Sequence, residues 1–394
     1  MNKKLLLGTS ALCAVAMAAA AQAQTANEPI KLGIGGYLHA AYGNIVSENG
    51  TNTKGLHRDD IKQDNVLNIK GSTKLDNGIT AGASIQIRAE NLNTSTTATQ
   101  DGKTGLDTIK RAYGFLRGAY GEVRLGDDDD ARRQMAFAAP VAASGDFGAN
   151  SPGTNFSNNP VSTNSTFAVL ANTSRTDKIV YFTPTIAGFS FAASYSPTGD
   201  KGHRGGGTNS SRTTAGQVSN ELSAAGNYSG KFGDFQLDAY TGVSSGTREA
   251  PAAGSSSKDN PLIWAIGSVV GWGPFKFGGA YEEVNNARQP ATGSPGHLDN
   301  KTFDVGALYG IGPFSVALDW TRGQYNGFAG STTGGAQAVL NIINLNAAYV
   351  LGPGVQIEAA IDYEIYRSHV TPTASAATQN YSGLALMAGY NFTF

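Results

Sequence analysis

The chain has 394 residues, and its 29 basic and 30 acidic side chains leave a net charge of −1. This balance gives no excess positive charge for binding nucleic acid. The single cysteine, Cys13, lies near the N-terminus, so the rest of the chain has no disulfide, cysteine-ligated metal site or cysteine nucleophile. After the N-terminal segment there is no run of 18 or more apolar residues, which excludes a transmembrane helix and leaves a β-barrel as the way to cross a membrane.

The N-terminal segment, residues 1–23, has the composition of a cleaved secretory signal. Lys3 and Lys4 give a basic start, an apolar run follows, and the stretch AQA at 21–23 fits the small-x-small cleavage rule. We predict cleavage after Ala23 and a mature barrel domain over residues 24–394, which has 27 basic and 30 acidic residues.

Short stretches rich in Gly, Pro, Asn and Asp recur along the chain, each flanked by alternating apolar and polar residues. Such stretches suit hairpin connections of two to five residues. Between them lie eight long stretches rich in Ser, Thr, Gly and Asn, which have the composition of solvated loops; the third and longest runs from about Asp127 to Ser174. The seven short stretches lie at 75–79, 118–122, 184–188, 230–234, 271–275, 310–314 and 351–355.

Fifteen connections that alternate between long and short join sixteen antiparallel segments. Both ends of the chain then lie on the side of the short turns, and pairing of the first and last strands would close the sheet. The sequence therefore predicts an all-β fold, a sixteen-stranded antiparallel transmembrane β-barrel with short periplasmic turns and long outer loops.

The side chains of individual segments alternate between an apolar and a polar face, as expected of strands between lipid and water. Aromatic residues gather near the turns, where interfacial girdles belong. A soluble β-sandwich predicts the same alternation but not aromatic residues at both ends of many strands. The apolar series include Phe314, Val316, Leu318 and Trp320, and also Val355, Ile357, Ala359, Ile361, Tyr363 and Ile365.

The last strand ends on aromatic residues at alternate positions, Tyr390, Phe392 and Phe394. Chain ends usually fray unless a sheet holds them. We expect this strand to pair with the first strand, IKLGIGGYLHAAYGN at 30–44, so that the wall has no free edge.

Two hairpins resemble those of the Gram-negative general porins. RAYGFLRGAYGEVRLGDDDD, at 111–130, resembles the hairpin that leads into the third outer loop of that family, and SRTDKIVYFTPTIAGFSFAASYSP, at 174–197, resembles the next hairpin. The terminal Phe394 matches the barrel-assembly signal of such proteins. The resemblance implies an outer-membrane homotrimer through which small hydrophilic solutes diffuse, and a long third loop that folds inward and narrows the pore.

Charged residues in and near the third loop are the candidate pore constriction. Fixed charges on the loop facing opposite charges on the wall would set a transverse field across the channel. The alternative is a solvated acidic corner, with the wall bases paired to Glu90 and Glu122. The candidate acids are Asp127, Asp128, Asp129, Asp130 and Asp146, and the candidate bases on the early strands are Lys70, Arg88, Lys110 and Arg124.

Other chemistries find little support in the residues. The four-Asp run offers oxygen ligands for Ca²⁺ but lacks the spaced D-x-D-x-D-G pattern of a dedicated loop. The five histidines occur singly, no pair has metal-ligand spacing, and no catalytic constellation is present. We therefore expect no enzyme activity, no cofactor and no resident metal.

Three functions remain open on the sequence. The first is a general porin for passive diffusion of ions and small hydrophilic solutes. The second is a solute-selective channel, for a sugar or an anion, with the same architecture. The third is a surface-recognition barrel in which the outer loops are the active part. Planar-bilayer conductance discriminates among them.

Overall fold

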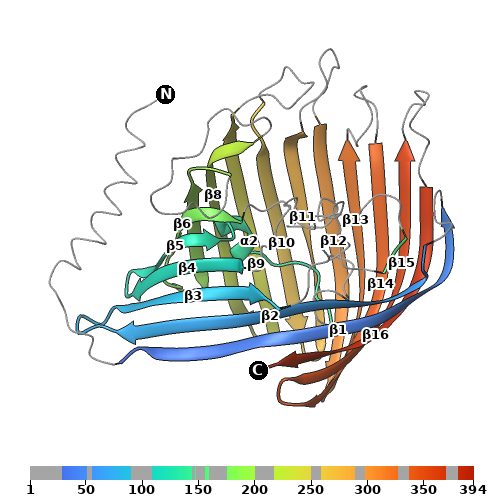
Figure 1. Cartoon of the computed structure of the whole chain (residues 1–394), viewed down its shortest axis with the longest axis horizontal. Helices are drawn as coiled ribbons and strands as arrows, with labels where there is room; N and C mark the ends of the chain where they lie inside the picture. Colours follow the sequence, from blue (N-terminus) through green and yellow to red (C-terminus); the bar gives the residue numbers. More distant parts are fainter. Residues whose placement is uncertain are drawn as a thin grey trace.

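A computed structural model of the chain describes residues 29–50, 56–89, 109–143, 147, 156–158, 175–199, 217–249, 259–288, 298–326, 337–369 and 380–394. Its sixteen strands form one closed antiparallel barrel, as predicted (Figure 1). The expected signal segment lies outside these residues. The strands are β1 (Lys31–Gly50), β2 (Asp59–Lys74), β3 (Thr80–Arg88), β4 (Ile109–Gly118), β5 (Gly121–Asp128), β6 (Thr176–Phe182), β7 (Phe189–Ser196), β8 (Val218–Phe232), β9 (Phe235–Arg248), β10 (Leu262–Trp272), β11 (Phe275–Arg288), β12 (Leu298–Ile311), β13 (Phe314–Asn326), β14 (Gln337–Gly352), β15 (Val355–His369) and β16 (Asn380–Thr393).

All seven predicted short turns connect neighbouring strands, from β2–β3 to β14–β15. Each contains one glycine with positive φ, a backbone conformation that glycine adopts without steric cost. At Gly121 the need for glycine is also steric, because an added Cβ would lie 2.0 Å from the carbonyl oxygen of Phe182 on the neighbouring strand. These glycines are Gly78, Gly121, Gly188, Gly233, Gly273, Gly312 and Gly354.

The predicted two-faced strands are present. On β13, Leu318 and Trp320 are exposed, whereas Asp319 and Thr321, which alternate with them, are buried. In a closed barrel the exposed apolar face is the outer face, and the polar face is the inner one. Near the short turns, the ring of Trp272 stacks between those of Phe235 and Phe275, with centroid distances of 6.1 and 6.4 Å, as in an interfacial aromatic girdle.

The first and last strands pair and close the wall. β1 and β16 are antiparallel over Tyr37–Gly50, with one register shift. The backbone N–H of Gly36 donates to Phe394 O at 2.9 Å, and the backbone N–H of Phe394 donates to Gly36 O at 3.1 Å. The C-terminal residue is therefore held in the sheet, while its ring lies on the exposed face. The role of Tyr390, Phe392 and Phe394 as an assembly signal stays a prediction.

Across the described ranges, no helix is long and apolar enough to span a membrane. One short helix, α2 (Ala131–Gln134), follows β5 directly. It contacts β7, β8 and β9, which places it against the wall beyond the strand that precedes it.

Candidate functional site

The chain leaves β5 through the run Asp127–Asp130 and turns at once into α2. Asp130 is the N-cap of this helix, and its Oδ1 accepts from the backbone N–H of Arg133 at 2.9 Å. The backbone N–H of Asp129 donates to Asp128 Oδ1 at 2.9 Å. The acidic run therefore shapes the start of the segment as well as supplying charge.

Arg132 fixes α2 to the inner face of the wall. Its side chain is fully buried, its guanidinium forms an ion pair with Glu282 on β11, and its Nε donates to Ser244 Oγ on β9 at 3.0 Å. Its backbone N–H donates to Ser223 Oγ on β8 at 3.0 Å. Gly242 on β9 leaves room for this side chain, because a Cβ there would lie 2.8 Å from Arg132 Cγ.

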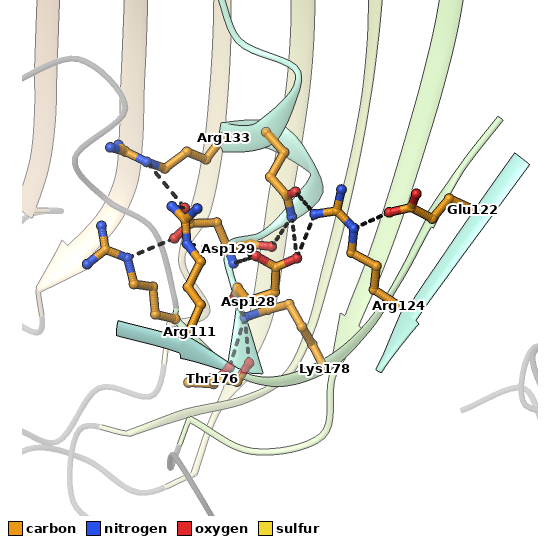
Figure 2. Close-up of polar contacts among 10 residues, drawn as sticks. Arg111, Glu122, Arg124, Asp128, Asp129, Arg133, Thr176 and Lys178 are labelled. Atoms are coloured by element: carbon orange, nitrogen blue, oxygen red, sulfur yellow. Dashed lines mark hydrogen bonds and ion pairs between the residues drawn. The ribbon is translucent and has the colours of Figure 1, made fainter. Parts of the chain in front are cut away.

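Asp128 and Asp129 sit within a cluster of guanidinium groups (Figure 2). Asp128 Oδ2 accepts from Arg124 Nη1 at 3.0 Å. Asp129 pairs with Arg111 of β4, with Arg175 Nε at 2.9 Å and with Arg133 Nε at 3.8 Å. Both carboxylates are buried, three guanidinium groups surround Asp129, and that of Arg111 also lies 3.9 Å from Asp128 Oδ1, so three positive charges face two carboxylates in this part of the cluster.

The ionisation of Asp129 follows from these contacts. Burial alone would raise the pKa of the carboxyl group, but the charges of Arg111, Arg175 and Arg133 outweigh burial and hold the pKa below its ordinary value. The ion pairs of Asp129 therefore contribute stability above the ordinary aspartate pKa, and that stability is lost as the pH falls through the lowered folded-state pKa. Asp129 stays ionised at neutral pH.

Arg124 connects the acidic run to the wall. Besides Asp128, it pairs with Glu122 and donates from Nη1 to Gln134 Oε1 at 2.7 Å. Its guanidinium lies 4.8 Å from the ring centroid of Tyr113 and 4.6 Å from that of Phe182, a cation–π arrangement that orients its planar fork.

The other predicted bases lie on the same part of the wall at different distances from this cluster. The electrostatic neighbours of Lys110 include Asp64, Arg88, Arg111 and Arg175, so Arg88 and Lys110 extend the positive region. Lys70 is exposed and lies 5.2 Å from the ring centroid of Phe115, and no described ion pair joins it to the acidic run.

The structure separates the four aspartates that sequence analysis grouped together. Asp128 lies on the inner face of β5 with Arg124, and Asp129 and Asp130 follow it. The alternation of β5 places Asp127 on the opposite face, with the exposed Leu125. Asp146 lies outside the described residues.

The segment after α2 follows the inner face of the wall toward the last strands. The backbone N–H of Ala139 donates to Asp304 Oδ1 on β12 at 3.1 Å. Farther along, the N–H groups of Ala142 and Ala143 donate to Asn346 Oδ1 on β14 at 2.7 and 3.1 Å. Each of these acceptors comes from the polar face of its strand, so wall side chains satisfy the backbone of an irregular segment.

Two aromatic residues farther along the same segment, Phe147 and Phe156, contact residues of β1. The ring of Phe147 meets that of His39 edge-on at 5.1 Å, and His39 Nε2 lies 3.4 Å from Glu358 Oε2 on β15. The ring of Phe156 fills the space beside Gly43, where a Cβ would lie 2.2 Å from Phe156 Cγ, and Lys62 Nζ lies 4.7 Å from the ring centroid.

The carboxylates of Asp128, Asp129 and Asp130 form ion pairs with arginines. Within the described part of the chain, no group of three or more His, Cys, Asp or Glu side chains is arranged to hold a metal ion. This arrangement can instead set the charge and the width of an aqueous path. Charged groups in a confined, partly desolvated site act more strongly on a passing ion than charged groups on an open surface.

Sequence reasoning missed several residues of this cluster. Arg111 alternates with Tyr113 and Phe115 on β4 and could have been found from strand alternation. Glu282 could not, because it is 150 positions from Arg132 and only the tertiary fold brings them together. Lys178 is buried on β6, where its Nζ donates to Asp128 O and to Thr176 O, the latter at 2.8 Å (Figure 2).

A closed sixteen-stranded barrel with an apolar outer face, a polar inner face and a charged segment against its inner wall is the architecture of an outer-membrane channel. The family model described as Gram-negative porin matches residues 8–368, and the chain belongs to this family. It is therefore an outer-membrane channel for passive diffusion of small hydrophilic solutes.

Solved structures with the same fold have low sequence identity to the chain. An anion-selective porin from Comamonas acidovorans is 15% identical with a TM-score of 0.57, covering 93% of this chain and 100% of that chain. The trimer form of in-vitro folded OmpT, an outer-membrane protein of Vibrio cholerae, is 10% identical with a TM-score of 0.57 and the same coverage. The outer-membrane channel DcaP of Acinetobacter baumannii is 14% identical with a TM-score of 0.54, covering 94% of this chain and 99% of that chain. A search of curated protein sequences finds no significant match.

Proposed function

We propose that the chain is a general porin whose third loop, from about Asp127 to Ser174, folds into the lumen and sets the width and charge of the pore. The observation that carries this proposal is the series of contacts from the described part of the loop to the inner wall. Arg132 reaches β11, Ala139 reaches β12 and Ala142 reaches β14. A sixteen-stranded barrel leaves an aqueous lumen, and a segment across it reduces that lumen to a constriction.

The constriction in this proposal is lined by the acidic run and by the bases of the early strands. Asp129, which follows β5, forms a direct ion pair with Arg111 on the wall, and Asp128, the last residue of β5, pairs with Arg124 of the same strand. The assignments of Asp146 and Lys70 to the constriction stay predictions, whereas the alternation of β5 argues against that of Asp127.

A preference for anions is the second candidate function, within the same architecture. It is favoured by the guanidinium groups of Arg111, Arg133 and Arg175, three positive charges that face the two carboxylates of Asp128 and Asp129. The name of the Comamonas structure, an anion-selective porin, agrees with this candidate but belongs to a protein only 15% identical.

We also propose that the mature protein starts after residue 23 and assembles as a homotrimer. The trimer form of the Vibrio OmpT structure supports the second point by fold similarity. Outer-membrane lipid and small hydrophilic solutes are the expected partners of such an assembly, with Phe394 as the expected assembly signal.

Single-channel recording in planar bilayers tests the proposed function. Purified folded protein in KCl is expected to give large currents that rise linearly with voltage, in groups of three equal steps if the protein is a trimer. A saturable current blocked by one sugar would instead identify the selective channel. Absence of current from correctly folded, heat-modifiable protein would contradict the proposal and favour surface recognition.

A further inference from the structure

A cavity of about 650 Å³ lies between the loop segment and the wall strands near two short turns. Phe137, Pro140 and Val141 of the loop line one side. The wall side comes from β8 to β12 at the turns β8–β9 and β10–β11, which are periplasmic in barrels of this kind. Its volume falls within the range of sites for small organic ligands.

The wall side of this cavity is one row of inner-face residues across five neighbouring strands. Lys231 on β8 pairs with Gln236 on β9, which pairs with Gly271 on β10, which pairs with Lys276 on β11, and Lys276 pairs with Leu308 on β12. Two cations therefore flank an amide and a glycine at the same height of the wall. Gly271 leaves the centre of the row without a side chain.

Neither lysine of this row is engaged elsewhere in the described structure. Lys231 and Lys276 are both exposed and make no ion pair among the described residues. The nearby Asp238 is instead held by Ser229 and by Gln236 Nε2, the latter at 3.0 Å. The lining also includes Asp234 in the β8–β9 turn, which is exposed and forms no ion pair with either lysine among the described residues, so the positive charges of the two lysines stay available to a solute.

The opposite side of the cavity is apolar and rigidly supported. Phe137 packs edge-on against the buried Tyr240, with ring centroids 6.5 Å apart. Its carbonyl oxygen lies so close to the wall at Gly267 that a Cβ there would be 2.3 Å away. An apolar side fixed opposite two cations is complementary to a solute with an apolar body and an anionic end.

We propose that this cavity is a binding subsite for small amphipathic carboxylates, such as aromatic acids, on the periplasmic side of the loop. The apolar body lies against Phe137, Val141 and Leu308, and the carboxylate pairs with Lys231 and Lys276. The subsite deepens the proposed function and rests on it, because it presumes a solute that enters an aqueous lumen. The cavity is separate from the cluster around Asp129, which lies directly after β5. The two sites share no residue.

Titration calorimetry of the folded protein in detergent with benzoate tests the subsite, and acetate is the control solute that lacks the apolar body. Wild-type protein is expected to bind benzoate saturably and acetate at least about tenfold more weakly. The double variant Lys231→Gln with Lys276→Gln is expected to weaken benzoate binding by about tenfold or more, because a charge-assisted contact is lost at each lysine.

Two further variants separate the subsite from a general charge effect. Gly271→Leu fills the centre of the row and is expected to abolish benzoate binding; a Cβ at this position meets its nearest atom at 3.4 Å, so the wall accepts it. Lys74→Gln is the matched control, an exposed inner-face lysine at the end of β2 that does not line the cavity. It is expected to bind benzoate like the wild type.

Equal binding of benzoate and acetate, or benzoate binding unchanged in the Lys231 and Lys276 double variant, would overturn the subsite. Such a result with normal KCl conductance would leave the porin function intact. Absence of conductance in the wild type would overturn the proposed function itself, so the two failures are distinguishable. If the Gly271 variant does not fold, the lysine variants alone decide the question.

Discussion

Replacing Arg132 with methionine is expected to weaken the attachment of α2 to the wall by about 3–5 kcal/mol, because it leaves the buried carboxylate of Glu282 without its cation. Arg132 is fully buried and also holds Ser244. Loss of this anchor frees the start of the loop segment from the inner wall. The expected readouts are a lower denaturation temperature of the heat-modifiable barrel and a noisier single-channel current.

The double variant Arg132→Met with Glu282→Leu is the control, since it removes both charges together. Replacing a buried ion pair by apolar residues of similar volume is often neutral or stabilising. We expect this variant to recover most of the lost stability. If the single variant matches the wild type in both readouts, the Arg132 to Glu282 pair does not anchor the segment.

Neutralising Asp129 by Asn is expected to shift the reversal potential in a salt gradient toward anions. The change removes the carboxylate that Arg111, Arg133 and Arg175 all pair with and makes the cluster more positive by one charge, while Arg111 Nε still lies 3.9 Å from Asp128 Oδ1. A unit charge at roughly 16 Å and an effective dielectric constant of about 20 changes the energy of an ion by about 1 kcal/mol, a factor of about five in permeability ratio before salt screening. The opposite change, Arg111→Gln with Arg175→Gln, is expected to shift it toward cations.

Asp127→Asn is the matched control for this experiment. It removes the same charge two positions away, but β5 places Asp127 on the face opposite Arg124. The reversal potential of the Asp127→Asn variant is expected to stay close to that of the wild-type protein. Equal shifts from Asp127→Asn and Asp129→Asn would contradict the assignment of Asp129 to the ion path.

The barrel could be predicted from sequence because its determinants are local. Each short turn contains a glycine in a conformation that other residues rarely adopt, and Gly78 and Gly354 mark the first and last of these turns. Each strand repeats a two-residue alternation that fixes which face meets lipid. The pairing of β1 with β16 followed from the strand count and the aromatic C-terminus.

The site could be predicted only in part because its contacts join distant segments. The acidic run was found, but its partner Arg175 is 46 positions from Asp129 and Glu282 is 150 positions from Arg132. Grouping Asp127 with its neighbours ignored the alternation that separates Leu125 and Asp127 from Arg124 and Asp128 on β5. The hydrogen bonds of the loop backbone to Asn346 carry no sequence signal, because any residue type supplies the same N–H group.

The central claim, that the loop segment lies against the inner wall and narrows the lumen, is tested most directly by one engineered disulfide. Ala139 Cβ lies 3.2 Å from the position of a Cβ at Gly306 on β12, about 0.3 Å below the short end of the usual Cβ–Cβ range of disulfides, so a small outward shift of the segment would allow the bond. Beyond Cys13 the chain has no cysteine to interfere. Folded Ala139→Cys with Gly306→Cys, compared with each single variant, is expected to form the intramolecular disulfide readily under mild oxidation while the single-channel conductance stays near that of the wild type. A pair that stays reduced in the folded protein, or a disulfide that forms only with a large fall in conductance, would contradict the account.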